Sequence, residues 1–175
     1  MRTTSKTKLL YNWGGSSALE SHVITPPFQN SLSKILDTEV SLTIRGQGLN
    51  YGDAALYHKT LSTHFWDKII HFDKDLGLIK CPSGITLDKI LRFIVPKGYF
   101  LPVTPGSKNI SLGGAIAADV HGKNHHHDGS LSSFITSLTI QTSAKVKTSA
   151  RLLENSFLTN KVFFRTMSIK NREIF

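Results

Sequence analysis

Glycine is distributed unevenly along this chain of 175 residues, and its distribution constrains the fold more than any other feature. All 13 glycines lie between Gly14 and Gly129. Because glycine adopts positive φ angles without strain and leaves backbone N–H groups uncovered, glycine clusters mark tight turns and ligand-facing loops. The sequence therefore predicts a glycine-rich domain at residues 21–143, preceded by an N-terminal segment at 1–20 and followed by a basic tail at 144–175.

Strand and helix signals alternate between the glycines. Helical spacing of apolar residues predicts helices at 28–37, at 86–95 with Thr86 as N-cap, and over one or two turns at 112–118. Short β-prone runs predict strands at 22–25, 40–44, 66–72, 76–81, 99–103 and 135–141. This order of elements predicts an α+β or mixed α/β domain.

Composition narrows the functional classes. The formal net charge is +9, yet no run of five basic residues occurs, and from Lys145 onward seven Lys and Arg stand against two Glu. A basic tail on an ordinary surface is therefore favoured over a nucleic-acid-binding module.

We expect no transmembrane helix and no secretory signal, because no apolar run is long enough. Cys81 is the only cysteine, which favours a reducing compartment such as the cytoplasm.

The first stretch with chemical meaning is IRGQGLNYGDA at residues 44–54. A predicted strand runs into a loop with glycines at 46, 48 and 52, where successive N–H groups can point into one concavity and bind a phosphate. The stretch matches neither the Walker loop nor the GxGxxG dinucleotide fingerprint. A turn-rich connection between strands is the alternative interpretation.

The second stretch is LPVTPGSKNISLGG at residues 101–114. Gly113 and Gly114 stand at the start of a short apolar helix, with Ser111 as a candidate N-cap. Small residues at a helix N-terminus indicate either an anion-binding site or close packing of the helix.

The third stretch, GGAIAADVHGKNHHHDGS, is rich in histidine. A zinc site needs spaced ligands. Neighbouring residues of an extended segment point to opposite faces, so at most two of the three consecutive histidines, His125 and His127, converge. His121 and Asp128 are the residues that can join them. We therefore predict no metal site. The choice is between a polar loop and a cofactor-facing loop, in which His121 donates a hydrogen bond and Lys123 supplies charge.

Taken together and in this order, the three stretches resemble the FAD-linked oxidases whose flavin domain is of the vanillyl-alcohol-oxidase (PCMH) type. The resemblance extends over residues 9–142 and is closest to the branch that contains the decaprenylphosphoryl-ribose oxidases. LYNWGG near the start and PSGITLDKIL also look like that branch. The resemblance implies a flavin domain of two α+β lobes with FAD between them, and a reaction in which a hydride leaves a sugar-type alcohol carbon.

The resemblance also implies which residues bind FAD. The loop that wraps the diphosphate would comprise Ile44, Arg45, Gly46, Gln47, Gly48, Leu49, Asn50, Tyr51, Gly52, Asp53 and Ala54. The diphosphate and the flavin would be lined by Gly106, Ser111, Leu112, Gly113, Gly114, Ala118, Asp119, Val120 and His121. Lys123, with Asn124 and His125, would face the substrate, and Lys123 is the candidate catalytic residue. Other branches attach FAD through a histidine at the position of Leu49, so we expect non-covalent FAD here.

The chain departs from the family after the strand near Ile140. The family continues with an acidic turn, a Phe-Trp segment and GGxGLTG, none of which follows here. We therefore expect the C-terminal part of the flavin domain and the substrate domain to be missing, and the tail to be frameshifted, truncated or a divergent substitute that forms an amphipathic helix. The alternatives to an active oxidoreductase are an inactive remnant and one half of a split enzyme. Expected partners are a separately encoded C-terminal half or an epimerase-partner reductase.

Overall fold

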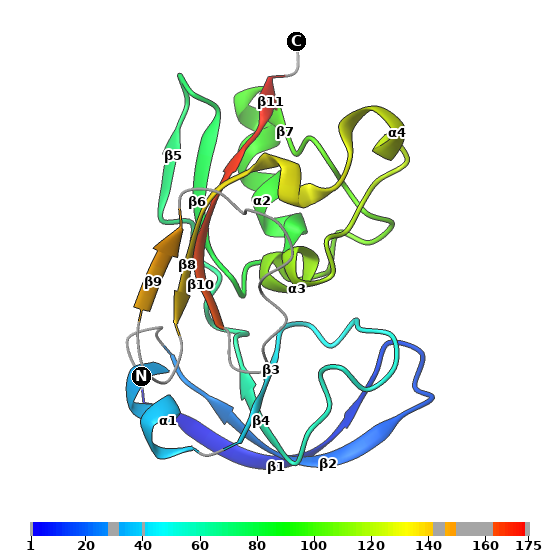
Figure 1. Cartoon of the computed structure of the whole chain (residues 1–175), viewed down its shortest axis with the longest axis vertical. Helices are drawn as coiled ribbons and strands as arrows, with labels where there is room; N and C mark the ends of the chain where they lie inside the picture. The colour runs from blue at the N-terminus through cyan, green and yellow to red at the C-terminus, as the bar shows by residue number, and fades with distance from the viewer. Residues whose placement is uncertain (1, 28–31, 40, 142–145, 150–162, 174–175) are drawn as a thin grey trace. The chain divides into compact units, whose positions relative to one another are not determined.

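The computed structural model describes residues 2–27, 32–39, 41–141, 146–149 and 163–173. The chain divides into two compact units, Met1–Trp66 and Asp67–Phe175, each of which combines a β-sheet with helices (Figure 1). The predicted fold of two α+β units is therefore confirmed. Among the helices of the described residues, none has the length and apolar character that crossing a membrane requires.

The first unit is a four-stranded sheet with one short helix. Its strands lie in the order β1-β2-β4-β3; β1 pairs antiparallel with β2, whereas β4 pairs in parallel with both β2 and β3. The elements are β1 (Thr4–Tyr11), β2 (Ala18–Thr25), α1 (Leu32–Thr38), β3 (Thr43–Arg45) and β4 (Lys59–Ser62). Trp66 is buried, and its indole N–H donates to the Pro26 carbonyl at 3.1 Å.

Sequence reasoning found only part of this unit. The predicted strand at 22–25 is the second half of β2, and the predicted helix at 28–37 contains most of α1, although residues 28–31 lie outside the described residues. The strands β1 and β4 were missed. Nearly all of β1 is exposed, so no alternation of apolar and polar residues marks it as a strand.

The second unit is built on a five-stranded antiparallel sheet in the order β5-β6-β10-β8-β9, with a two-stranded sheet of β7 and β11. Its strands are β5 (His71–Asp73), β6 (Leu78–Pro82), β7 (Tyr99–Phe100), β8 (Ile135–Gln141), β9 (Val146–Ser149), β10 (Phe163–Lys170) and β11 (Arg172–Glu173). Its helices are α2 (Leu87–Ile94), η2 (Val95–Lys97), α3 (Leu112–Ala117), α4 (His125–Asp128) and η3 (Leu131–Phe134).

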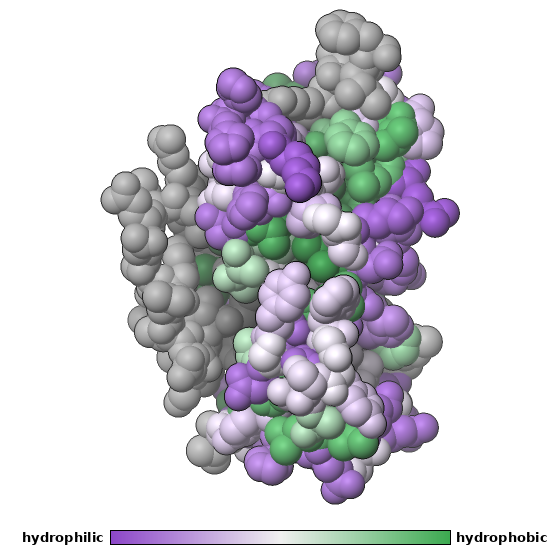
Figure 2. Space-filling model, turned by 90° about the vertical axis from the view of Figure 1, so that its right-hand side faces the viewer, coloured by the Kyte–Doolittle hydropathy of each residue, from purple (hydrophilic) through white to green (hydrophobic). Residues whose placement is uncertain are grey.

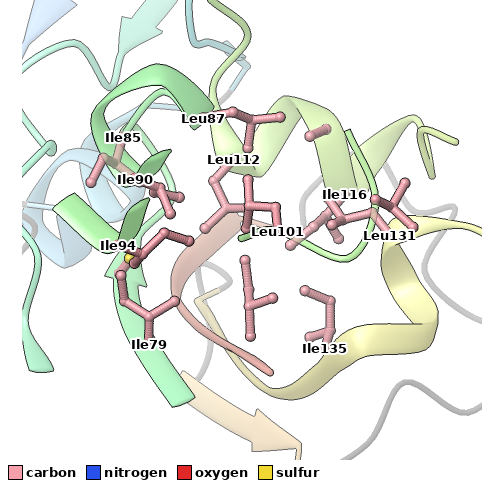
Figure 3. Close-up of a cluster of buried hydrophobic side chains, with 14 of the residues drawn as sticks. Ile79, Ile85, Leu87, Ile90, Ile94, Leu101, Leu112, Ile116, Leu131 and Ile135 are labelled. Carbon is pink, nitrogen blue, oxygen red and sulfur yellow. The ribbon is translucent and has the colours of Figure 1, made fainter. Parts of the chain in front are cut away.

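The core of the second unit lies between the sheet and the helices α2 and α3. Figure 3 shows Ile79 of β6, Ile90 of α2 and Leu112 of α3 pointing toward one another, and all three are fully buried. Cys81 belongs to the same cluster. Burial raises the pKa of its thiol to about 12, so the thiol stays protonated at physiological pH and is no nucleophile.

Helix α2 follows the sequence prediction closely. Thr86 is its N-cap, and the hydroxyl of Thr86 accepts the Lys89 N–H at 3.3 Å. The strand β8 also spans the predicted residues. The strands predicted at 66–72 and 99–103 are much shorter, because β5 begins only at His71 and β7 ends at Phe100.

The basic tail contributes a central strand to the sheet. β10 pairs with β6 on one side and with β8 on the other, and Ile169 lies opposite both Ile79 and Ile135. The helix expected in the tail is therefore wrong for Phe163 and Phe164, which lie in β10, while residues 150–162 lie outside the described residues.

Polar and apolar side chains are interspersed on the face drawn in Figure 2, where most of the described surface is hydrophilic and the apolar areas are separate. Large exposed apolar residues nevertheless occur in the first unit, among them Trp13 with 62% of its surface exposed and Tyr51 with 84%. Tyr51 belongs to the glycine-rich loop at residues 44–54, and the Trp13 ring contacts the Tyr51 ring.

We predict that Ile169→Ala lowers the free energy of unfolding by about 2–5 kcal/mol, because it leaves a cavity between β6 and the helices. Urea unfolding of the full chain measures this loss. Lys170→Ala is the matched control, since Lys170 is exposed on the same strand and should change stability little. Equal stabilities of the two variants would show that the tail strand does not belong to the core.

Candidate functional site

The glycine-rich loop of the first unit leaves the end of β3. Arg45 ends the strand, and residues 46–50 follow without regular structure, half-buried. Gly48 has a φ of 70° and Gly52 a φ of 61°, in the left-handed region that favours glycine. No N–H group of residues 46–50 donates to an acceptor among the described residues. These amides are therefore available to an anion.

The Arg45 side chain turns back toward this loop. Its guanidinium donates to the carbonyl oxygens of Tyr11 at 2.6 Å and of Ala55 at 3.1 Å. A Cβ at Gly48 would overlap the guanidinium, so the glycine leaves room for the arginine. Burial lowers the pKa of Arg45 from its ordinary value, but an arginine in a protein remains a cation at neutral pH. The loop therefore combines available amides with a fixed positive charge.

A turn before β2 contacts the same loop, and sequence reasoning did not place it in the site. The buried Asn12 fixes the turn by accepting the Ser17 N–H at 3.2 Å. Trp13 then donates its N–H to the Asn50 carbonyl at 3.1 Å, and its ring meets that of Tyr51 edge-on. The Asn50 Oδ1 is buried and has no hydrogen-bond partner among the described residues, so it can accept a hydroxyl from a ligand. In the sequence, only the resemblance of LYNWGG pointed to this turn.

In the second unit, the two glycines at the start of α3 serve the protein itself. Gly113 donates its N–H to the Ser83 carbonyl at 2.8 Å, and Gly114 donates to the capping Ser111 hydroxyl at 3.3 Å. A Cβ at Gly113 would lie 2.9 Å from the Cβ of Ser83. Close packing, the alternative stated from the sequence, therefore explains Gly113. The phosphate contact expected of Gly113 and Gly114 stays a prediction.

Ser83 follows β6 and was not singled out from the sequence. Its hydroxyl is buried and has no hydrogen-bond partner among the described residues. Because Ser83 lies against the first turn of α3, this hydroxyl is a second polar group that a ligand at that turn can satisfy. In the sequence, only the resemblance of PSGITLDKIL included this serine, because a serine between a proline and a glycine otherwise looks like an ordinary turn residue.

The segment between Pro105 and Ser111 is held by the start of α2. Asp88 donates its N–H to the Lys108 carbonyl at 2.8 Å, and its carboxylate pairs with the Lys108 ammonium at 2.7 Å. Hydrogen bonds from Lys108 and Arg92 lower the pKa of Asp88 below its ordinary value. Gly106 lies exposed in this segment with open space around it.

The HGKNHH motif lies on a loop that is fixed at its base and along its length. An isolated antiparallel bridge joins His121 to Ser130 at the base. Farther out, the Asn124 amide donates to the Pro102 carbonyl at 2.8 Å. Lys123 is exposed on this loop between the two attachments.

The histidines of this loop stand close together but not as expected. The extended segment expected at these residues is wrong, because His125–Asp128 forms the helical turn α4. The ring centroids of His121 and His125 lie 4.9 Å apart, and the Nδ1 of His125 lies 3.2 Å from the Gly122 carbonyl. Among the described residues, no three His, Cys, Asp or Glu side chains are grouped so that they could hold one metal ion.

The predicted site residues differ in how far they reach solvent. Those of the loop from Ile44 to Asn50 are half-buried, as are Gly113 and Val120, whereas Leu112 belongs to the core and offers a ligand only its backbone. The exposed ones are Tyr51, Gly52, Asp53, Ala54, Gly106, Gly114, Ala118, Asp119, His121 and Lys123. Each of these contacts with a cofactor stays a prediction.

Residues 27–145 match the family of FAD binding domains. Among the similar proteins, decaprenylphosphoryl-beta-D-ribose oxidase from Mycolicibacterium smegmatis is 29% identical over 143 residues, which cover 78% of this chain and 31% of the oxidase. The probable mitochondrial D-2-hydroxyglutarate dehydrogenase of Oryza sativa subsp. indica is 29% identical over 134 residues, which cover 72% of this chain and 23% of that protein. The resemblance inferred from the motifs is thus confirmed.

The fold is also found in a solved structure. Cholesterol oxidase from Brevibacterium sterolicum has a TM-score of 0.82 and 16% sequence identity, over 98% of this chain and 38% of the oxidase. The chain therefore spans much less than half the length of each of these proteins.

We predict that Gly48→Ala destabilises the chain more than Gly52→Ala does. Both substitutions place a Cβ on a left-handed backbone, at about 1 kcal/mol each. Only Gly48→Ala also displaces the Arg45 guanidinium from its two carbonyl oxygens, which adds roughly 1–3 kcal/mol. Urea unfolding compares the two variants. Equal losses would mean that the arginine does not depend on the glycine.

Proposed function

Because the chain belongs to the family of FAD binding domains, we propose that it is the cofactor-binding part of an FAD-dependent oxidoreductase that acts on an alcohol carbon of a sugar-type substrate, including a polyprenyl-linked sugar. Bound FAD supplies the capacity to accept a hydride from such a carbon. The observation that carries the proposal is the loop at residues 46–50, with its available amides and the Arg45 guanidinium fixed beside them.

The residues of the first unit fit the diphosphate of FAD. A diphosphate is bound by several N–H donors together with a positive charge. The loop at residues 46–50 offers N–H groups without an acceptor among the described residues, and the Arg45 guanidinium supplies the charge. The Oδ1 of Asn50, which has no hydrogen-bond partner among the described residues, adds an acceptor for a hydroxyl of the cofactor. Leu49 stands where other branches carry a histidine that bonds the flavin, and a leucine side chain forms no such bond. We therefore propose that FAD is held without a covalent link.

The loop with HGKNHH is the proposed substrate-facing part of the second unit. Lys123 is exposed and carries a positive charge that orients a substrate oxygen, while His121 offers a ring nitrogen for a hydrogen bond. The Asn124–Pro102 hydrogen bond and the His121–Ser130 bridge fix the backbone of the loop that carries these side chains. The names of the two relatives support a hydroxyl-bearing substrate, since both ribose and 2-hydroxyglutarate carry one.

A second candidate is an FAD-binding half that works together with a separately encoded polypeptide. The region that matches covers 31% of the ribose oxidase that the chain resembles. An alcohol oxidation over a flavin needs a site from which water is excluded, and a partner chain would supply the cover. Co-expression with the neighbouring open reading frames, followed by co-purification, tests this candidate.

We also propose a cytoplasmic location, since the single cysteine is buried and reduced.

We predict that the purified full chain binds FAD at about one-to-one stoichiometry and shows flavin absorption bands in the visible spectrum. Acid precipitation should release all of the flavin into the supernatant, because no covalent bond is formed. A folded but colourless protein that also fails to take up added FAD would contradict the proposal. Flavin that stays with the precipitate would contradict the non-covalent link alone.

We predict that Arg45→Gln weakens FAD binding about tenfold or more, because a charge-assisted contact to the diphosphate is lost. Quenching of FAD fluorescence during titration measures the dissociation constant. Arg92→Gln removes an equal charge from an exposed ion pair with Asp88 and is the control. If both variants bind FAD as tightly as the unchanged chain, Arg45 has no part in the site.

A further inference from the structure

Asp119 occupies a backbone position that usually belongs to glycine. At the end of α3, Asp119 donates its N–H to the Ile116 carbonyl and Val120 donates to the Ala115 carbonyl, both at 3.0 Å. This pair of bonds is the Schellman motif, in which the residue after the C-cap is left-handed and is most often glycine. Asp119 adopts that conformation with a φ of 40°, as the only non-glycine residue of the described chain with a positive φ. The helix end therefore carries strain that a glycine would avoid.

The Asp119 carboxylate makes contacts that a glycine would not. Its Oδ1 accepts the Ser132 N–H at 3.2 Å, and the hydroxyls of Ser130 and Ser132, which lie 3.0 Å from each other, help to lower the pKa of the carboxyl group. Burial raises the pKa of Asp119, but these hydrogen bonds and the nearby His121 together hold it below its ordinary value. The group is therefore a charged acceptor at neutral pH, and charged acceptors make the stronger hydrogen bonds.

These contacts lie at the base of the HGKNHH loop. The loop leaves the chain at His121 and returns at Ser130, where the isolated bridge joins the two residues. One residue farther on, Leu131 donates its N–H to the Val120 carbonyl at 2.9 Å. Through these hydrogen bonds, Asp119 connects the segment that leaves α3 with the segment that returns from the loop.

We propose that Asp119 is a positioning residue whose carboxylate closes the base of the loop at residues 121–130 and thereby sets how His121 and Lys123 face the bound cofactor and substrate. The proposal rests on the proposed function for the identity of that cofactor. It also changes the role that the resemblance implies for Asp119. The carboxylate acts on the protein's own loop, while the direct contacts to the ligand come from the residues that the loop carries.

Loop order should change more than stability when Asp119 is replaced by glycine. Asp119→Gly relieves the backbone strain, which offsets the lost hydrogen bonds, so the urea midpoint of the full chain should change little. The same substitution removes the acceptor for the Ser132 amide, whose hydrogen exchange should become about tenfold faster. The dissociation constant for FAD, measured by fluorescence quenching, should rise about fivefold or more as the loop loses its direction.

Asp119→Asn is the matched control. Asparagine tolerates the left-handed conformation and keeps an oxygen that accepts the Ser132 N–H. Its amide exchange and its dissociation constant for FAD should therefore lie within about twofold to threefold of those of the unchanged chain. Rescue by asparagine separates the loss of the acceptor from any general disturbance of the fold.

Three results would overturn the proposal. One is a glycine variant with unchanged Ser132 exchange, because the carboxylate then does not close the loop. Another is faster exchange with unchanged FAD binding, because the loop then has no bearing on the cofactor. The third is an unchanged chain that binds no FAD at all. This third result overturns the proposed function as well, whereas the first two leave it standing.

Discussion

The fixed guanidinium of Arg45 is the interaction on which the first unit's loop depends. Two carbonyl oxygens hold it, one from the end of β1 and one from the far side of the loop, so a single cation joins three parts of the chain. Its charge has no carboxylate partner in these contacts, and carbonyl dipoles leave part of a cation's field uncompensated. Beside it stand amides that the described protein does not use. Both features suit the binding of an anion.

The second unit uses its glycines in another way. Because Gly113 has no side chain, α3 can approach Ser83 closely, and the Gly113 N–H donates to the Ser83 carbonyl. The glycine position at the other end of the same helix is filled by Asp119. The helix α3 thus has a glycine at its start, where it packs closely against Ser83. At its end it has the strained Asp119, which holds the following loop. The two ends of α3 fix the segments that precede and follow it.

The sequence predicted those parts of the fold in which periodicity and capping agree. The helix with Thr86 as N-cap and the strand Ile135–Gln141 lie where expected because local signals decide them. The strand β1 is not predicted from the sequence, because its exposed and mostly polar residues show no alternation of apolar and polar side chains. The place of β10 escaped notice because pairing between strands distant in sequence leaves no local trace. For the site, glycine clusters located the loops correctly. They did not show which amides are free, because that depends on partners such as Ser83 that lie elsewhere in the chain.

The strand β10 also changes the meaning of the basic tail. A charge excess in a terminal segment indicates a nucleic-acid-binding arm only where the segment lies free of the fold. Here the backbone of Phe163–Lys170 is hydrogen-bonded on both sides within the sheet, and Ile169 is fully buried in the core. A strand in that position serves first to join β6, which leads to Ser83 and α2, to β8, which receives the chain from the HGKNHH loop. The tail therefore bears on the candidate site through the sheet that supports both of its flanks, and the exposed Lys170 places one positive charge of the tail on the surface of that sheet.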